Sequence, residues 1–173
     1  QWTPLPPMPH KTAGATACVL NGRLYVMGGA GEGAEGHRHR YNKLQVLEMT
    51  EENGLAWTVK ADMPVHRHDP ASIVHEGKIM LIGGCAIEEH ASSVMVYDEH
   101  TDSWATAPPL PVACQGRDDY KALHIVQEGE ERMLILHRLG CLARRPNGEW
   151  ADVRMMPPVP LPMSFAAASL RLG

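Results

Sequence analysis

The stretch NGRLYVMGG, residues 21–29, decides the fold because EGKIMLIGG, residues 76–84, repeats its pattern. Each copy contains a turn glycine, an apolar run and a double glycine, and such a run is typical of a strand buried on both faces. The chain from the Met-Pro pair at 8–9 to the first double glycine is as long as the chain from the pair at 63–64 to the second. The sequence therefore contains an internal repeat.

A tryptophan motif extends this repeat over the whole chain. Four times, a tryptophan is followed six residues later by Met or Leu and then by Pro. The tryptophans, at positions 2, 57, 104 and 150, are 55, 47 and 46 residues apart, and a period of about 50 residues is typical of a propeller blade. We therefore expect an all-β fold, a β-propeller of four-stranded blades.

The aligned repeats predict where the strands lie. The first blade is expected to have strands at 15–20, 23–27, 44–49 and around Trp57, and the second at 71–75, 78–82, 94–97 and around Trp104. The third repeat is irregular because His137-Arg138 replaces the double glycine, and its third strand is shortened to 141–144. The expected blades cover about 13–64, 69–111 and 119–157, with flanking strands of a preceding and a following blade at 1–9 and 164–172.

The stretch VYDEHTDSW, residues 96–104, together with the proline-rich residues 108–111, resembles the kelch repeat. The double glycine at 83–84 stands at the distance before this stretch that the family shows. The resemblance implies a kelch-type β-propeller, of which the chain supplies about three blades. Because the sequence begins at Gln1 without an initiator Met, we expect a fragment, or one arc of a ring that further chain completes.

Composition narrows the class of function. The net charge is −4, from 16 Lys and Arg against 20 Asp and Glu, and the positive residues are scattered, so we expect no nucleic-acid partner. Apolar stretches fall short of the ~18 residues needed to span a bilayer, so we expect no membrane association. The four cysteines lack Cys-x-x-Cys spacing, which favours a reducing, cytoplasmic compartment over a disulfide framework.

Arg67 is the first candidate for binding a partner. It stands where kelch repeats commonly carry an arginine, in the loop that joins the outer strand of one blade to the inner strand of the next. The resemblance implies that this loop faces a partner protein, and a guanidinium suits a carboxylate. The alternative is that Arg67 pairs with Asp62 or Asp69 and orders the loop. The equivalent positions are Thr12, Cys114 and Pro160, and Arg117 in the longer third loop is a substitute.

Two His-x-His pairs, in residues 37–39 and 66–69, are the second group of candidates. Two imidazoles and a carboxylate suit Zn²⁺ or Cu²⁺, and a pH-responsive loop is another interpretation. We expect no bound metal and no cofactor, because each pair lacks a third His or Cys nearby in the sequence. We also expect the two loops to lie at opposite ends of the blades.

The sequence as a whole predicts a non-catalytic protein-interaction module or scaffold, with substrate-recognition adaptors as one role that the resemblance implies. No nucleophile, base and acid stand at a recognisable spacing. Two alternatives stay open: an architectural subunit of a large assembly, and part of a catalytic kelch-like propeller, an oxidase or sugar isomerase. We expect a protein partner, and self-association that completes the propeller. The expected partner-binding residues are Arg67, His66, His68, Lys11, Arg117, His37, Arg38 and His39.

Overall fold

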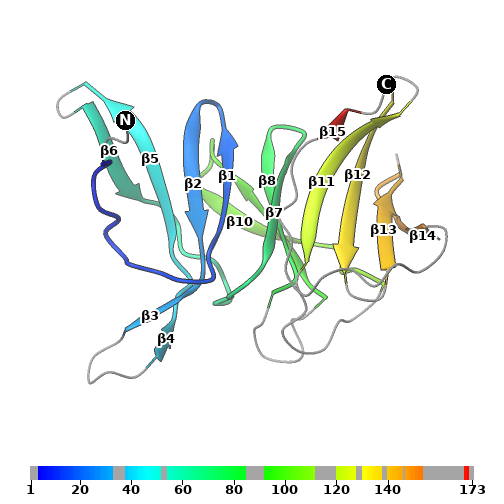
Figure 1. The fold of residues 1–173 in the computed structure, drawn as a ribbon, viewed down its shortest axis with the longest axis horizontal. Helices are drawn as coiled ribbons and strands as arrows, with labels where there is room; N and C mark the ends of the chain where they lie inside the picture. Colours follow the sequence, from blue (N-terminus) through cyan, green and yellow to red (C-terminus); the bar gives the residue numbers. More distant parts are fainter. Residues whose placement is uncertain are drawn as a thin grey trace.

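In the computed structural model, most of the strands are arranged in three successive sheets (Figure 1). The described residues are 4–32, 38–51, 54–84, 92–111, 120–127, 130–137, 140–145, 147–153 and 170–171. Every regular element within these ranges is a strand, which confirms the all-β prediction. Within the same ranges no helix is long and apolar enough to cross a membrane.

The first blade is a four-stranded antiparallel sheet in the order β1-β2-β5-β6. Its connection from β2 to β5 contains a small separate hairpin, β3-β4. The strands are β1 (Thr16–Leu20), β2 (Arg23–Met27), β3 (Ala30–Glu32), β4 (Arg38–Arg40), β5 (Leu44–Thr50) and β6 (Gly54–Val59). The glycine turn and apolar run read from the sequence thus form the β1-β2 hairpin.

The second blade repeats the same order of strands, from β7 inside to β10 outside. Its strands are β7 (Ala71–His75), β8 (Lys78–Ile82), β9 (Val94–Asp98) and β10 (Ser103–Ala107). The inner strands β1 and β7 lie side by side, as do β7 and β11 of the third blade. The sheets are therefore consecutive blades of a propeller.

The third blade contains a fifth strand that the sequence did not predict there. Its strands are β11 (Lys121–Gln127), β12 (Glu130–His137), β13 (Gly140–Arg144), β14 (Trp150–Val153) and β15 (Leu170–Arg171). The segment 164–172 was expected to begin a following blade, but β15 pairs in parallel with β11, whose inner edge offers unpaired backbone groups. Most of that segment, and Trp2 of the other flanking strand, lie outside the described residues.

Alternation along the strands of the second blade explains its continuous apolar runs. Ile79 and Leu81 belong to the core that the first and second blades share. Met80 and Ile82 belong to the core between the second and third blades, because successive side chains of a strand point to opposite faces. Each such burial contributes about 1.5–3 kcal/mol to folding. The middle blade is therefore covered on both faces.

The first blade is covered on one face. Val19 and Met49 lie on its outer face with 63% and 75% of their surface exposed. Part of this face is covered by the segment before β1, because the Trp57 indole donates a hydrogen bond of 2.8 Å to the carbonyl oxygen of Pro6.

The double glycines permit the close approach of successive blades. Gly28 has φ +71° and a Cβ there would lie 2.5 Å from the carbonyl oxygen of Arg67. Gly83 has φ +61° and its Cβ would lie 2.5 Å from the Tyr120 ring. Both conformations are ones that L side chains rarely adopt, which is why glycine stands at these two positions.

Each blade has two distinct ends (Figure 1). The hairpin turns β1-β2, β5-β6, β7-β8 and β9-β10 lie at one, which we call the hairpin end. The connections β2 to β5 and β6 to β7 lie at the other, the loop end. The prediction that the two His-x-His loops lie at opposite ends was wrong, because four strands that reverse direction three times return the chain to the end where it started.

Candidate functional site

A pocket at the loop end of the first blade has a volume of about 540 Å³. It lies between the segment that precedes β1 and the start of the β3-β4 hairpin. Its lining residues are Pro9, His10, Lys11, Thr12, Ala13, Ala30, Gly31 and Tyr41. The pocket therefore contains Lys11, one of the binding residues that the sequence predicted.

Tyr41 lies between two histidines in this pocket. Its ring centroid is 5.9 Å from that of His10 and 5.4 Å from that of His39. Gly31 permits this packing, because a Cβ there would lie 2.5 Å from the Lys11 carbonyl oxygen and 2.7 Å from the Tyr41 ring. His39 is thereby held beside the pocket.

The segment that carries His10 and Lys11 is fixed to the first blade by a buried amide. Gln45 has 2% of its surface exposed. Its Oε1 accepts a hydrogen bond of 2.7 Å from the backbone N–H of His10, and its Nε2 donates one of 3.0 Å to the His10 carbonyl oxygen. Ala13 and Ala30 exchange two backbone hydrogen bonds of 2.8 Å. The pocket wall is therefore part of the folded blade.

Arg67 is fully buried, in contrast to the partner-facing position that the resemblance implied. Its Nη1 donates a hydrogen bond of 2.6 Å to the carbonyl oxygen of Gly83, and its Nη2 donates to Ser93 Oγ. Thr12 is equivalent in the first blade, and its Oγ1 donates to the carbonyl oxygen of Gly28 at 2.9 Å. The two positions thus make the same contact with the first glycine of each pair, and Arg67 holds the loop.

The carboxylates proposed as alternative partners of Arg67 contact other groups. Asp62 forms an ion pair of 2.5 Å with Lys43. Asp69 lies 2.7 Å from His68 Nδ1. Its backbone N–H donates to the Gly14 carbonyl oxygen at 2.7 Å, so the loop that carries His66 and His68 is tied to the first blade.

His66 is close enough to the charged side chains of both His-x-His loops for their charges to act on it. Desolvation by burial lowers the pKa of its imidazole, and the nearby positive charges of Arg40, His39, Arg67 and His68 lower this pKa further. Charges act in this way only at short range. The Gly29 N–H donates to the Arg67 carbonyl oxygen at 2.6 Å, and the Gly29 carbonyl oxygen accepts from the Tyr41 N–H at 2.9 Å. The loops that carry His39 and His66 therefore lie at the same end of the blades, although the sequence placed them at opposite ends.

The predicted site residues fall into three groups. Lys11 and His39 are exposed at the loop end, and His66 and His68 are partly buried there. Arg67 lies beneath them. Arg38 belongs to β4 but its side chain lies outside the described residues, as do His37 and Arg117 altogether.

Sequence reasoning missed His10, Tyr41 and the role of Arg40. Arg40 is exposed and close to His66, but the positive residues are scattered along the sequence and did not mark it as a binding residue. Tyr41 directly follows the pair it supports, and the strand directions bring His10 to the same end. The direction of each successive strand, traced through the blade, would have placed these residues at the same end.

Two exposed cationic side chains at the loop end, Lys11 and Arg40, have no described carboxylate partner. The described residues also contain no group of three His, Cys, Asp or Glu side chains that could hold a metal ion. We define the loop-end surface as Lys11, His39, Arg40, His66 and His68. These side chains can donate hydrogen bonds and positive charge to carboxylates.

Comparison with known proteins places the repeats in a family. The Kelch motif model matches residues 66–111. Kelch-like protein 15 of Danio rerio is 29% identical over 88% of this chain and 26% of its own length. A putative F-box/kelch-repeat protein of Arabidopsis thaliana is 27% identical over 83% of this chain and 34% of its own. The chain thus spans a quarter to a third of these two relatives.

A solved structure supports the fold independently. The structure of YjhT superposes with a TM-score of 0.70 at 18% identity, over 90% of this chain and 56% of that one. At this identity the likeness bears on the fold. The matched motif and the kelch-repeat relatives support a kelch-repeat family for this chain, and the likeness to YjhT supports the fold.

Proposed function

We propose that the chain is a non-catalytic protein-interaction module whose loop-end surface binds an acidic segment of a partner protein. The observation that carries this proposal is the gathering of Lys11, His39, Arg40 and His66 from three separate connections at one end of the first blade. Exposed loops held by a rigid scaffold are common binding sites. The partner's carboxylates would pair with Lys11 and Arg40, which have no described carboxylate partner.

Rigid display is the mechanism we propose. Gln45 and Arg67 hold the two loops through buried hydrogen bonds. A loop that is ordered before binding loses less conformational entropy when a partner docks. Arg67 acts in this scheme as a positioning residue, and the residues around it make the contacts.

Recognition of a substrate by an adaptor is the finer role we propose. Two relatives carry Kelch-like and F-box/kelch-repeat names and are much longer than this chain. A propeller that binds one protein through its loops and belongs to a longer polypeptide fits such a role. Mass spectrometry of the complex that the full-length protein forms tests this role. An adaptor should bind one protein through the propeller and a second protein through another part of the polypeptide. Absence of that second protein would contradict the role.

We also propose that further blades, supplied by additional polypeptide, cover the open face of the first blade. Val19, Met49 and Val59 of that blade are exposed. This chain covers 56% of YjhT, so YjhT extends well beyond the matched region. Large exposed apolar faces favour association. Light scattering of this chain alone should therefore show self-association at micromolar concentration, and a soluble, folded monomer would contradict the proposal.

A cytoplasmic location is also part of the proposal. Cys18 and Cys141 are free thiols, and burial raises the pKa of Cys18 to about 12. Reduced cysteines are typical of cytoplasmic proteins. Alkylation in denaturant, which exposes buried thiols, of protein taken directly from cells should label all four cysteines of the sequence, whereas a disulfide found in that protein would argue for another compartment.

Quantitative capture of partners by matched charge reversals tests the interaction surface. Arg40→Glu reverses a charge on the loop-end surface, and Arg145→Glu reverses an equally exposed arginine after β13. Proteins that bind the unmodified chain should bind Arg40→Glu about 10-fold more weakly, and Arg145→Glu should retain them. The same loss in both variants, or in neither, would contradict the proposed surface.

A further inference from the structure

The tryptophans of two blades make the same hydrogen bond. The Trp57 indole donates to the carbonyl oxygen of Pro6 at 2.8 Å, and the Trp104 indole donates to that of Ala61 at 2.9 Å. In both cases the acceptor stands four residues after the tryptophan of the preceding repeat. By this register, the acceptor for Trp150 is Pro108.

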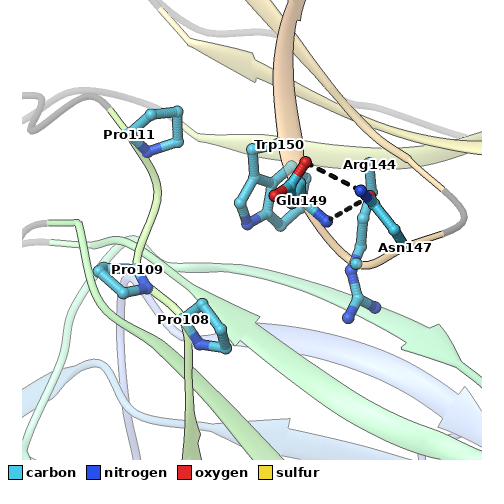
Figure 2. Close-up of a pocket in the computed structure, with 8 residues that line it drawn as sticks. Pro108, Pro109, Pro111, Arg144, Asn147, Glu149 and Trp150 are labelled. Atoms are coloured by element: carbon cyan, nitrogen blue, oxygen red, sulfur yellow. Dashed lines mark hydrogen bonds between the residues drawn. The ribbon is translucent and has the colours of Figure 1, made fainter.

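A pocket of about 560 Å³ lies where this third bond is expected (Figure 2). Pro108, Pro109 and Pro111 form one wall, and Trp150 and Arg144 lie on the other. Within the described part of the chain, the Trp150 N–H makes no hydrogen bond. The irregular third repeat thus leaves a pocket with a free indole donor at the joint between the second and third blades.

The turn beside the pocket is held by its own hydrogen bonds. The Asn147 side chain donates to the Glu149 carboxylate at 2.9 Å and accepts from the Glu149 backbone N–H at 3.1 Å. The backbone N–H of Arg145 donates to the Glu149 carbonyl oxygen at 2.8 Å. The Glu149 carboxylate is therefore directed toward Asn147 (Figure 2).

Arg144 contributes a positive charge to the same pocket. One guanidinium nitrogen lies 3.6 Å from Met80 Sδ, which is a weak acceptor. Among the described carboxylates, none forms an ion pair with it. The pocket thus combines proline and indole surfaces, one N–H donor and one guanidinium.

We propose that this pocket binds an extended peptide that carries an acidic residue. The other two joints identify the occupant, because there the indole binds a backbone carbonyl of an extended, proline-containing segment. A peptide carbonyl accepts from Trp150 Nε1–H, its proline or aliphatic side chains pack against Pro108 and Pro109, and its carboxylate pairs with Arg144. Grooves with aromatic walls bind such segments elsewhere. This site is separate from the loop-end surface and does not rest on its proposed function.

The indole signals of the ¹⁵N-labelled chain test the proposal directly. The probe is acetyl-Pro-Pro-Glu-Pro-Pro-amide, and Trp150→Phe identifies the Trp150 signal by its loss. Without peptide, the Trp150 N–H should exchange with solvent faster than those of Trp57 and Trp104. The peptide should shift the Trp150 signal and leave the Trp57 and Trp104 signals in place.

Matched variants separate the pocket from general charge attraction. Arg144→Ala should weaken peptide binding about 5-fold or more, and Arg145→Ala, which removes the same charge one residue away, should change it by less than about 2-fold. A Gln-containing peptide should bind unmodified protein about as weakly as the Glu peptide binds Arg144→Ala. Unchanged Trp57 and Trp104 signals establish that each variant is folded.

Three results would overturn the proposal. The first is a Trp150 N–H that exchanges as slowly as that of Trp104. The second is a Trp150 signal that stays in place up to millimolar peptide. The third is an equal loss of affinity in Arg144→Ala and Arg145→Ala.

Discussion

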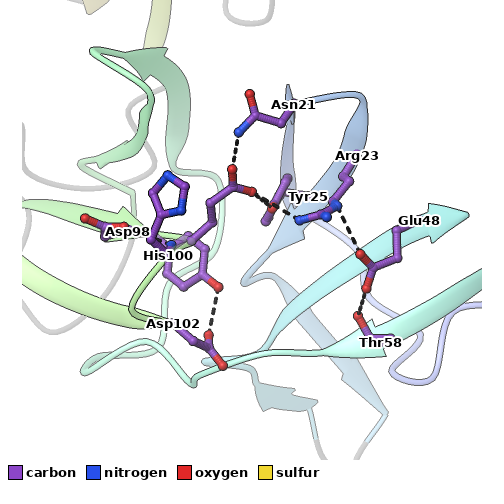
Figure 3. Close-up of polar contacts among 10 residues, drawn as sticks. Asn21, Arg23, Tyr25, Glu48, Thr58, Asp98, His100 and Asp102 are labelled. Carbon is purple, nitrogen blue, oxygen red and sulfur yellow. Dashed lines mark hydrogen bonds and ion pairs between the residues drawn. The ribbon is translucent and has the colours of Figure 1, made fainter. Parts of the chain in front are cut away.

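The two ends of the first and second blades use charge in different ways. At the hairpin end, Glu99 of the second blade accepts hydrogen bonds from the Tyr25 hydroxyl, at 2.5 Å, and from Asn21 of the first blade (Figure 3). Arg23 lies 3.5 Å from Glu99 and 3.0 Å from Glu48. The contacts of Glu99 join the second blade to the first, so this end is a structural joint.

The carboxylates around that joint are paired as well. Asp102 accepts from the Tyr97 hydroxyl at 2.7 Å, and it also accepts at 2.9 Å from the backbone N–H of Ala61, in the β6 to β7 connection of the first blade. Lys78 pairs with Asp98 at 2.9 Å. At the loop end, by contrast, Lys11 and Arg40 have no described carboxylate partner. At the hairpin end, paired charges connect the blades, whereas the exposed and unpaired Lys11 and Arg40 are the reason that we propose the loop end as the surface for a partner.

Substitution of the double glycine should have the largest effect, because the loop end depends on it. Gly83→Val should lower the free energy of unfolding by more than about 2 kcal/mol, since its Cβ would overlap the Tyr120 ring. Gly28→Val should behave similarly against the Arg67 carbonyl oxygen. Denaturant unfolding measures both changes.

Gly77→Val is the matched control at the hairpin end. Gly77 also has positive φ, +71°, but its Cβ would meet nothing within 4 Å. Its cost should therefore be limited to backbone strain and be clearly smaller than that of Gly83→Val. Equal costs at both positions would show that close approach of the blades is not what the double glycine provides.

Removal of the Glu99 charge should have an intermediate effect that depends on pH. Hydrogen bonding to Tyr25 is the largest cause that lowers the Glu99 pKa, and Asn21 and Arg23 lower it further. A lowered carboxyl pKa stabilises the fold above the ordinary value, and this contribution is lost as pH falls through the lowered pKa. Glu99→Gln should therefore cost about 1 kcal/mol at neutral pH and less in acid.

Urea unfolding at pH 7 and pH 3 measures this difference. Glu76→Gln is the control, because Glu76 is 83% exposed and lies 3.7 Å from His75. It should change stability by less than about 0.5 kcal/mol at both pH values. If Glu99→Gln lowered stability by the same amount at pH 7 and pH 3, the Glu99 charge would not be what stabilises the joint at the hairpin end.

The pH dependence of partner binding should be the smallest effect. The pKa of His66 is lowered in the free protein, and a partner carboxylate would raise it, so binding takes up protons and strengthens as pH falls. Affinity should rise about 3-fold between pH 8 and pH 6. His66→Gln should flatten this rise in a calorimetric titration, and an affinity that weakens toward pH 6 would contradict an acidic partner.

The sequence predicted the strands well because their causes are local. The turn at Gly77 and the apolar run to Ile82 define β8 without reference to the rest of the chain. The tryptophan frame even placed Thr12 and Arg67 in equivalent positions, and both contact the first glycine of a pair. Periodicity and turn chemistry are sufficient for features of this kind.

The candidate site was less predictable because it depends on chain direction and burial. The placement of the His39 and His66 loops at the same end follows from the path of four strands, which residue spacing alone does not reveal. The burial of Arg67 depends on how closely the Gly83 carbonyl of the next hairpin approaches. The pocket beside Trp150 exists because one repeat departs from the register that the others keep.

Hydrogen exchange of the chain with and without its captured partner tests the division between the two ends most directly. Binding at the loop end predicts slower backbone exchange in residues 9–13, 38–41 and 66–69, with the turns at 20–23 and 98–103 unchanged. Slower exchange confined to those turns, with the loop-end segments unchanged, would contradict the loop-end surface as the partner site.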